Sequence, residues 1–181
     1  MNALISELHQ DHVNLGRLLN LLERELDRLR RGENPNYWLL LDLVDYVESY
    51  PDQIHHPRED IIFEVYLESH QQGALAIRRL MDEHKSLVVQ SHELRELIDQ
   101  VTQSSVFPRD LIETRLTDYL AKQWEHLNLE EGEVFHILAA TLSPEEWDII
   151  RQRIPQAVDP LFGGAIQQRY QAIYEQIMLG S

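Results

Sequence analysis

Residues 54–63 have the sequence IHHPREDIIF and place two imidazoles and two carboxylates within about one and a half turns of a helix. Residues four apart in a helix share a face, so His55 with Glu59, or His56 with Asp60, offers a nitrogen and an oxygen to one ion. Taken alone, this stretch is more typical of a solvated polar patch near a helix end. The rest of the chain favours the metal site.

The composition limits the metal chemistry that the chain can perform. Its 181 residues, 43% of them hydrophobic, suffice for one domain with a substantial core and a small appendage. The sequence contains no cysteine, which excludes disulfides, thiolate metal sites and cysteine nucleophiles. Metal ligands must therefore be His, Asp, Glu or Tyr.

Charge and hydropathy predict a cytoplasmic protein. The net charge of −15 at pH 7 repels phosphate backbones, so we expect no nucleic-acid partner. The sequence has no apolar run of about 18 residues, and its N-terminus lacks the basic region of a signal peptide. We therefore expect no association with a membrane.

Apolar residues recur at steps of three and four along four long segments, which predicts amphipathic helices. The expected helices run from about Ile5 to Arg30, from about Asn36 to Gln71, from about Ala74 to Gln103, and from just after Pro108 to about Ile137. Strand signals are absent. We predict an all-α fold, with residues 1–140 as an up-down-up-down four-helix bundle and residues 141–181 as a C-terminal helical extension.

The extension carries helix signals but no recognisable chemistry. Ser143 and Glu146 form a predicted capping box at the start of a short helix that ends near Ile154. A last helix is expected from Gly164 to Met178. The extension either packs across the bundle or makes a dimer contact, so we expect a monomer or a homodimer.

Ionisable residues interrupt the apolar stripes. His12 falls on the first stripe and His84 on the third, while His126 and Glu130 occupy consecutive positions of the fourth. A single histidine on an apolar stripe is usually a buried core residue that binds nothing. The depth of these residues in the bundle is a better test.

Counting from the turns places these residues at one level. Helices rise about 1.5 Å per residue, so residues equally far from a short turn lie side by side. His12 precedes the first turn by about 22 residues, and residues 55–59 follow it by about 23. The same count pairs residues 55–59 with His84, and His84 with His126 and Glu130. Independent core histidines have no reason to share a level, whereas a metal site requires it.

The donors at this level suit two ions better than one. A carboxylate can bridge and neutralise two cations, while imidazoles fill the outer positions. This donor set suits iron or manganese, with zinc as an alternative. The residues predicted as ligands by this reasoning are His12, His55, Glu59, His84, His126 and Glu130.

These residues resemble the pattern of hemerythrin-like proteins of the histidine–histidine–glutamate cation-binding type. That pattern has a His on the first helix, His-x-x-x-Glu on the second, a His on the third, and His-x-x-x-Glu or His-x-x-x-x-Asp on the fourth. The matching motifs are DH at 11–12, HHPRED at 55–60, EH at 83–84 and HLNLEE at 126–131. The resemblance implies a non-haem site of two iron ions with bridging carboxylates, a vacant position, and binding of O2 or a related small molecule.

The sequence departs from the oxygen-carrying members at one position. They have His-x-x-x-His on the third helix, whereas Val88 follows His84 by four residues here. His56 is the residue that we expect to reach the second ion instead, as an adjacent ligand does in some members. The departure disfavours reversible oxygen carriage and favours sensing of iron or oxygen, a response to nitric oxide, or iron handling.

The remaining candidates are secondary. We expect His9 at the edge of the site, and we expect Glu130 rather than Glu131 to be the ligand because Glu130 lies on the stripe. Tyr119 and Gln123 face the same core, either as outer groups of the site or as ordinary core residues. The other histidines are predicted to lie outside the site: His70, His92 and His136.

The function predicted from these residues and the resemblance is binding of O2, NO or peroxide by a di-iron bundle. Two alternatives remain open at this point. One is a di-iron enzyme of the peroxidase or oxygenase type, which nothing in the sequence separates from a binding protein. The other is a structural interaction bundle whose histidines are buried and neutral.

Overall fold

The computed structural model describes residues 2–103 and 108–179, and this part of the chain is helical and contains no β-strand. The predicted all-α class is therefore confirmed. Its α-helices are α1 (Ala3–Arg30), α2 (Tyr37–Ser49), α3 (His56–Ser69), α4 (Ala74–Gln103), α5 (Arg109–Leu129), α6 (Phe135–Thr141), α7 (Pro144–Arg153) and α8 (Gln171–Leu179). The shorter elements are the π-helical turns η1 (Pro51–His55) and η2 (Glu130–Val134), and the 3-10 turn η3 (Gln168–Tyr170). Residues 104–107, between the third and fourth predicted helices, lie outside the described residues.

The ends of α1 follow from its sequence. The Asn2 side chain caps the N-terminus by accepting a hydrogen bond from the backbone N–H of Leu4. At the other end, Gly32 has a φ of 79°, which a residue without a Cβ adopts at low cost. The stripe predicted between these ends is buried, His12 included.

α2, η1 and α3 form one interrupted helix. The interruption is a π-helical turn, in which the N–H of His55 bonds to the carbonyl of Tyr50 at 3.1 Å and the N–H of His56 bonds to the carbonyl of Pro51. Pro57 consequently lies in the first turn of α3, where its missing N–H costs little. The break is thus an inserted residue before the proline, and not the bend at Pro57 that a helix-interior proline would produce.

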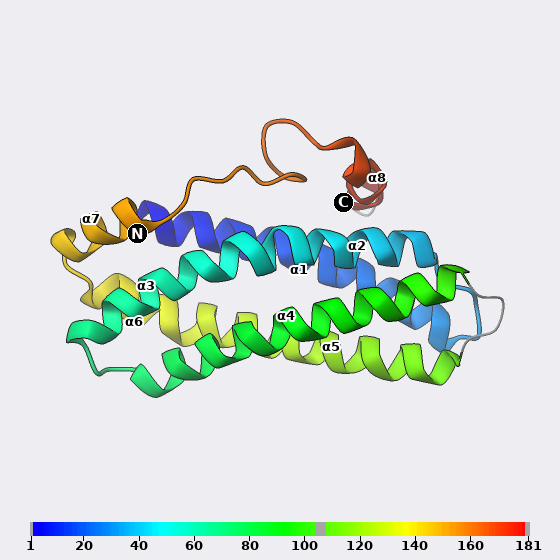
Figure 1. Cartoon of the computed structure of the whole chain (residues 1–181), viewed down its shortest axis with the longest axis horizontal. Coiled ribbons are helices and arrows are strands. Elements are labelled where there is room, and N and C mark those ends of the chain that lie inside the picture. Colours follow the sequence, from blue (N-terminus) through cyan, green and yellow to red (C-terminus); the bar gives the residue numbers. More distant parts are fainter. Residues whose placement is uncertain (1, 104–107, 180–181) are drawn as a thin grey trace.

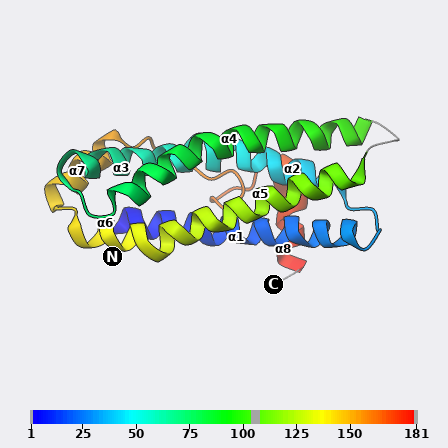
Figure 2. The same cartoon turned by 90° about the horizontal axis from the view of Figure 1, so that it is seen from below.

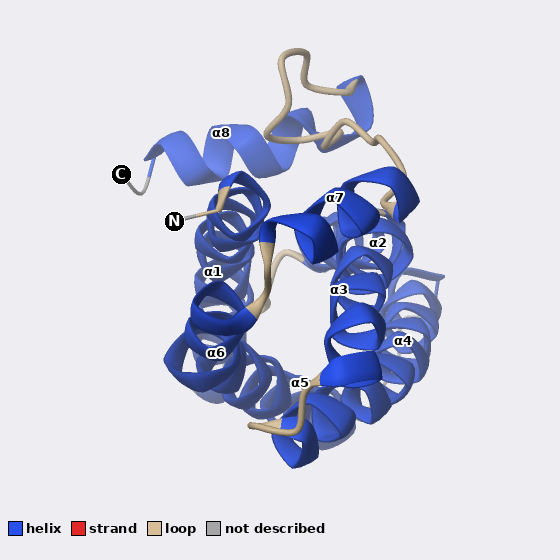
Figure 3. Cartoon of the chain, turned by 90° about the vertical axis from the view of Figure 1, so that its left-hand side faces the viewer, coloured by secondary structure: helices blue, strands red, loops and turns tan. Residues whose placement is uncertain are grey.

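The long helices pack around a common axis, as the end-on view in Figure 3 shows. α1 packs against α5, α5 against α4, and α4 against both α2 and α3, while α1 also contacts α2. In Figure 1, α4 extends along most of the bundle, and α5 is continued along it by η2 and α6. No helix in residues 2–103 or 108–179 is long and apolar enough to cross a membrane.

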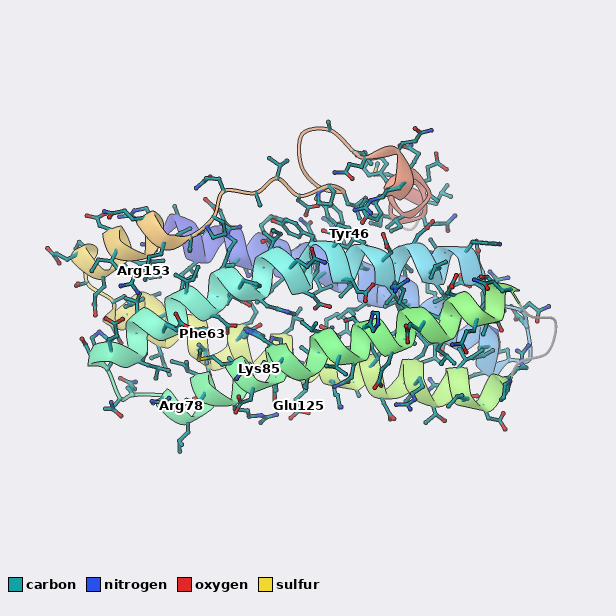
Figure 4. All side chains as sticks on the ribbon, in the orientation of Figure 1. Tyr46, Phe63, Arg78, Lys85, Glu125 and Arg153 are labelled. Carbon is teal, nitrogen blue, oxygen red and sulfur yellow. The ribbon has the colours of Figure 1, made fainter. Side chains whose placement is uncertain are left out.

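The core consists of two apolar clusters with a polar layer between them. One cluster includes Leu22, Leu43 and Leu116, and the other includes Leu8 and Phe63. Figure 4 labels Phe63 on α3, where its ring points into the bundle. Along α1, α4 and α5, the buried histidines fall between the residues of the two clusters. The sequence therefore places its ionisable core residues in a dry compartment.

The chain after α6 lies along the outside of the bundle. Ser143 and Glu146 form the predicted capping box, with reciprocal bonds of 3.2 and 2.8 Å. α7 packs on α3, and α8 contacts α1 and α2, which it crosses in Figure 2. Both helices of the extension thus contact helices of the bundle in this chain.

The last helix begins later than predicted. Residues 164–167 are not helical, and η3 and α8 together cover residues 168–179. The reason is a compact turn around Asp159, whose side chain accepts hydrogen bonds from the backbone N–H groups of Leu161 and Phe162. A Cβ at Gly163 would lie 2.4 Å from the carbonyl oxygen of Asp159, so only glycine fits this turn.

Candidate metal centre

The structure brings the residues predicted as ligands together in the polar layer. The set consists of His12, His55, His56, Glu59, His84, His126 and Glu130, and each of them is at most 4% exposed. They come from α1, η1, α3, α4, α5 and η2. Equal depth along the helices is the reason that they meet.

One group of donors consists of His12, His55 and Glu59, whose donor atoms lie within 4.8 Å of one another. Oε1 of Glu59 is 3.4 Å from Nε2 of both His12 and His55. The two imidazole nitrogens are themselves 2.9 Å apart. These three atoms therefore point at the same small volume.

A second group consists of His56, Glu59, His84 and His126, with donor atoms within the same 4.8 Å limit. The rings of His56 and His84 stack with centroids 4.4 Å apart, and those of His84 and His126 meet edge to face at 4.8 Å. Three imidazoles and one carboxylate thus converge on the side of the layer away from His12.

Two buried carboxylates face both groups. Glu59 presents Oε1 to His12 and His55, and Oε2 to His84 at 3.5 Å. Glu130 presents Oε2 to His12 at 3.3 Å, and Oε1 to His126 at 3.2 Å and His84 at 3.4 Å. Each carboxylate therefore spans the two groups with its two oxygens.

Outer carboxylates hold the opposite edges of the five imidazoles. Nδ1 of His12 lies 2.7 Å from Glu131, and that of His55 lies 3.1 Å from Asp11. The other pairs are His84 with Asp60 at 2.8 Å, His126 with Glu83 at 3.0 Å, and His56 with Asp52 at 3.4 Å. A carboxylate on Nδ1 fixes the ring and directs Nε2 inward, which is the usual support of a metal-bound histidine.

Four of these five outer carboxylates form a ring around the bundle. Each is the immediate sequence neighbour of a residue in the polar layer, and each contacts an imidazole on another helix. The pairs run from Asp11 to His55, from Asp60 to His84, from Glu83 to His126 and from Glu131 back to His12. Through this ring, each long helix supplies a carboxylate that orients an imidazole on the next helix.

Without a bound cation, the polar layer contains both protonated imidazoles and ionised carboxylates. Burial lowers the pKa of His12, but the hydrogen bond with Glu131 and the negative charges of Glu59 and Glu130 outweigh it and raise the pKa to about 10. In the same way, despite burial, the pKa of His84 is raised to about 10 and that of His126 to about 9. Burial raises the pKa of Glu130, yet the neighbouring imidazoles lower it to about 2. Protons on the imidazoles thus offset the two carboxylates.

Several donor atoms have no partner in this arrangement. In the part of the chain that the structure describes, both oxygens of Glu59, Oε2 of Glu130 and Nε2 of His126 are buried without a hydrogen bond. A buried polar atom without a partner costs roughly 1–3 kcal/mol. Cations placed among these atoms would partner all of them, so the residues present fit a metal centre.

Comparison with known families agrees with this geometry. Residues 3–138 match the model of the hemerythrin family, described as the hemerythrin HHE cation-binding domain. The chain belongs to this family. A comparison with curated proteins finds no match, and neither does a comparison with solved structures.

For this hemerythrin-family chain, the structure also places the secondary candidates. His9 is exposed and bonds to Glu131 at 2.9 Å, outside the polar layer. His92 and His136 are exposed, and the partly buried His70 bonds to Glu146. Glu131 faces Nδ1 of His12 and belongs to the ring, and the choice of Glu130 as the ligand stays a prediction.

The two segments that supply both a histidine and a glutamate to the polar layer, residues 55–59 and 126–130, each adjoin or contain a π-helical turn. η1 ends at His55, so that His55 and His56 are both only 2% exposed although they are adjacent. η2 begins at Glu130, and Glu130 and Glu131 both face the site from it. The inserted residue of a π turn rotates the following side chains, which explains how neighbours share one face.

A polar extension of the layer was only partly predicted. Tyr119 lies 3.1 Å from the hydroxyl of Ser91 and accepts a hydrogen bond from Gln123 at 3.0 Å. Within the described residues, Oε1 of Gln123 and both oxygens of Asp52 are buried without a hydrogen bond, although Asp52 lies 3.4 Å from Nδ1 of His56. Asp52 and Ser91 were not singled out from the sequence; Asp52 lies four residues before His56 on the same helix, which was a usable signal.

A cavity of about 170 Å³ opens between α4 and α5 beside His126. Its lining consists of Glu83, Ser86, Leu87, Lys122, Glu125 and His126. Val88, which replaces the second histidine of oxygen carriers on this helix, is 42% exposed. A side chain at position 88 therefore points away from the polar layer, and His56 occupies the layer instead.

Proposed function

We propose that the chain is a hemerythrin-like, non-haem di-iron protein that binds O2 or a related small molecule such as NO or peroxide. The observation that carries this proposal is the position of Glu59, which belongs to both groups of donors and presents one oxygen to each. A carboxylate in that position suits two cations of one centre better than one cation. The order of helix contacts supports the up-down-up-down four-helix topology that the centre requires.

The two groups of donors support one assignment of the ligands. His12 and His55 would hold one ion, and His56, His84 and His126 would hold the other, with Glu59 and Glu130 shared. Imidazole and carboxylate donors suit iron, with manganese or zinc as the alternatives. The ion at His12 has one imidazole fewer, so we assign the binding of the small molecule to that ion.

When bound, iron supplies a redox-active centre with an open position for a diatomic molecule or peroxide. The chain supplies the rest. The outer carboxylates orient the imidazoles, and the apolar clusters on either side of the layer keep bulk water out. We place the protein in the cytoplasm and assign it to sensing, stress response or iron handling.

The test uses the visible absorption spectrum of the full chain. Protein loaded anaerobically with Fe(II) is exposed separately to air, NO and hydrogen peroxide, with zinc-loaded protein as the control that cannot change oxidation state. We expect a new charge-transfer band with at least one of the three in the iron form only. Identical spectra before and after all three additions would contradict the proposal.

A further inference from the structure

Three tyrosines lead from the outer edge of the polar layer to the surface beneath the C-terminal segment. The hydroxyl of Tyr50 lies 3.4 Å from Oδ2 of Asp11, and the same oxygen lies 3.1 Å from Nδ1 of His55. The ring of Tyr46 is 6.2 Å from that of Tyr50, between centroids, and 5.3 Å from that of Tyr170. Figure 4 shows Tyr46 between α2 and the C-terminal segment. The three rings thus form a continuous series.

Each phenol in the series donates its hydrogen bond to a carboxylate of its own. Tyr50 donates to Asp11, and Tyr46 donates to Asp159 at 2.9 Å. Tyr170 donates to Asp45 at 3.2 Å, and its hydroxyl also lies 2.7 Å from Oγ of Ser49. This is the feature that oxidation of a tyrosine requires, because a phenol that loses an electron also loses its proton. A carboxylate at the phenol can take up that proton and return it.

Other buried tyrosines lack such a partner. Tyr66 is fully buried, but it donates to the backbone carbonyl of Gln72 at 2.8 Å. Tyr119 lies in the core between Ser91 and Gln123, neither of which is a base. Burial alone therefore does not account for the carboxylates of the series.

The outer end of the series reaches a charged surface. The guanidinium of Arg169 lies 4.4 Å from the centroid of the Tyr170 ring, and Arg169 also pairs with Asp45 at 3.3 Å. The side chains of Arg169 and Asp45 are 51% and 43% exposed, whereas Tyr170 is 1% exposed. A small electron donor in solution can therefore approach within one side chain of the ring.

We propose that Tyr50, Tyr46 and Tyr170 form a one-electron relay between the metal centre and the surface at Arg169 and Asp45. The inference rests on the proposed di-iron function, which supplies the oxidising centre. The oxidant is hydrogen peroxide and the donor is a small one-electron reductant such as ascorbate. Peroxide takes up two electrons and two protons and leaves as two water molecules.

The relay delivers these electrons one at a time. Tyr50 loses an electron to the centre and its phenolic proton passes to Asp11, which leaves a neutral tyrosyl radical. An electron from Tyr46 restores Tyr50 as the proton returns, and Asp159 holds the proton of Tyr46. The same exchange then moves the radical to Tyr170, with Asp45 as the proton acceptor. The external donor restores Tyr170 with one electron.

The competing explanation is that the tyrosines only fasten the C-terminal segment to the bundle. Tyr→Phe substitutions separate the two, because phenylalanine keeps the ring packing and removes the oxidisable phenol. Iron-loaded full chain, with deuterated tyrosine to identify the radical, is mixed with hydrogen peroxide and freeze-quenched for electron paramagnetic resonance. We expect a tyrosyl radical in the original chain and in the control Y66F, and none in Y50F.

The outer variants have separate signatures. Y170F should still form the radical, but its decay after addition of ascorbate should be at least an order of magnitude slower than in the original chain. A radical that persists in Y50F, that disappears in Y119F, or that decays equally fast with ascorbate in Y170F would overturn the relay. These results would leave the di-iron proposal intact if iron binding and the optical response to peroxide are retained.

A chain that takes up no iron would contradict the proposed function. A second experiment therefore tests the relay without any metal. The chain has no cysteine, so Gln168→Cys, on the exposed residue two positions before Tyr170, provides a unique attachment point for a photo-oxidant. A flash should then produce a tyrosyl radical that Y170F prevents and Y66F does not. Equal radical yields in Q168C and Q168C/Y170F would overturn the relay independently of any metal.

Discussion

Nε2 of His12 lies 2.9 Å from Nε2 of His55, although the two residues are 43 positions apart in the sequence. Two such nitrogens can share only one hydrogen. Burial lowers the pKa of His12, but the hydrogen bond with Glu131 and the negative charges of Glu59 and Glu130 raise it to about 10, so the pair holds that hydrogen at pH 7. A metal ion at this position must displace it.

Metal loading should therefore release protons. At pH 7 the raised pKa values of His12, His84 and His126 keep all three imidazoles protonated, whereas imidazole ligands are neutral. We predict release of about three protons per chain, falling towards zero as the pH is raised through about 10. An indicator dye in weakly buffered solution measures the release. Zinc should release as many protons as Fe(II), and loading without proton release at pH 7 would show that the imidazoles are not the ligands.

Removing Glu59 should affect both ions together. Its two oxygens face different groups of donors, so Glu59→Ala removes a ligand from each and leaves the repulsion between the cations less screened. We predict loss of both ions in elemental analysis. Glu64→Ala, on an exposed position of the same helix, is the matched control. One ion retained at full occupancy in Glu59→Ala would mean that Glu59 is not shared.

The ring of outer carboxylates should tune metal affinity without touching the metal. Asp60→Asn keeps the size of the side chain but weakens the hold on Nδ1 of His84, and we expect affinity to fall by about 10- to 100-fold. Asp82→Asn, an exposed position on α4, is the control. Competition with a chromophoric chelator gives both affinities, and equal values would exclude a role of the ring in orienting the imidazoles.

Pro57 should be needed for the placement of His56. Pro57 has no N–H for the carbonyl of Gln53, so the chain adopts the π turn η1 and both neighbouring histidines face the layer. Pro57→Ala restores that donor and allows a regular helix, in which residues 55 and 56 diverge by about 100°. We predict that Pro57→Ala and His56→Ala both weaken one ion and spare the other in an iron titration. Unchanged affinity for both ions in the two variants would rule this arrangement out.

The level of the site could be predicted from the sequence because helical rise is constant. Counting from the turns placed His12, His84 and His126 at one depth, and the structure has them there. The stripe also placed Glu130 in the core, where it is buried. Short-range regularity was sufficient for these assignments.

The π turns and the ring of carboxylates could not be predicted in the same way. A π turn inserts one residue without a distinctive sequence signal, so the periodicity predicted one helix from about Asn36 to Gln71 where the structure has α2, η1 and α3. The ring depends on contacts between helices, which helical periodicity does not specify. Acidic neighbours such as Asp11 beside His12 and Glu83 beside His84 were visible in the sequence, but their partners on other helices were not.

The most direct test of the central claim, a single centre of two ions joined by shared carboxylates, is the stoichiometry of Fe(II) binding. Metal-free full chain is titrated anaerobically with Fe(II), desalted, and analysed for iron and protein. The account predicts two iron ions per chain in the original protein and a loss of both in Glu59→Ala. One iron ion per chain or fewer at saturation would contradict it.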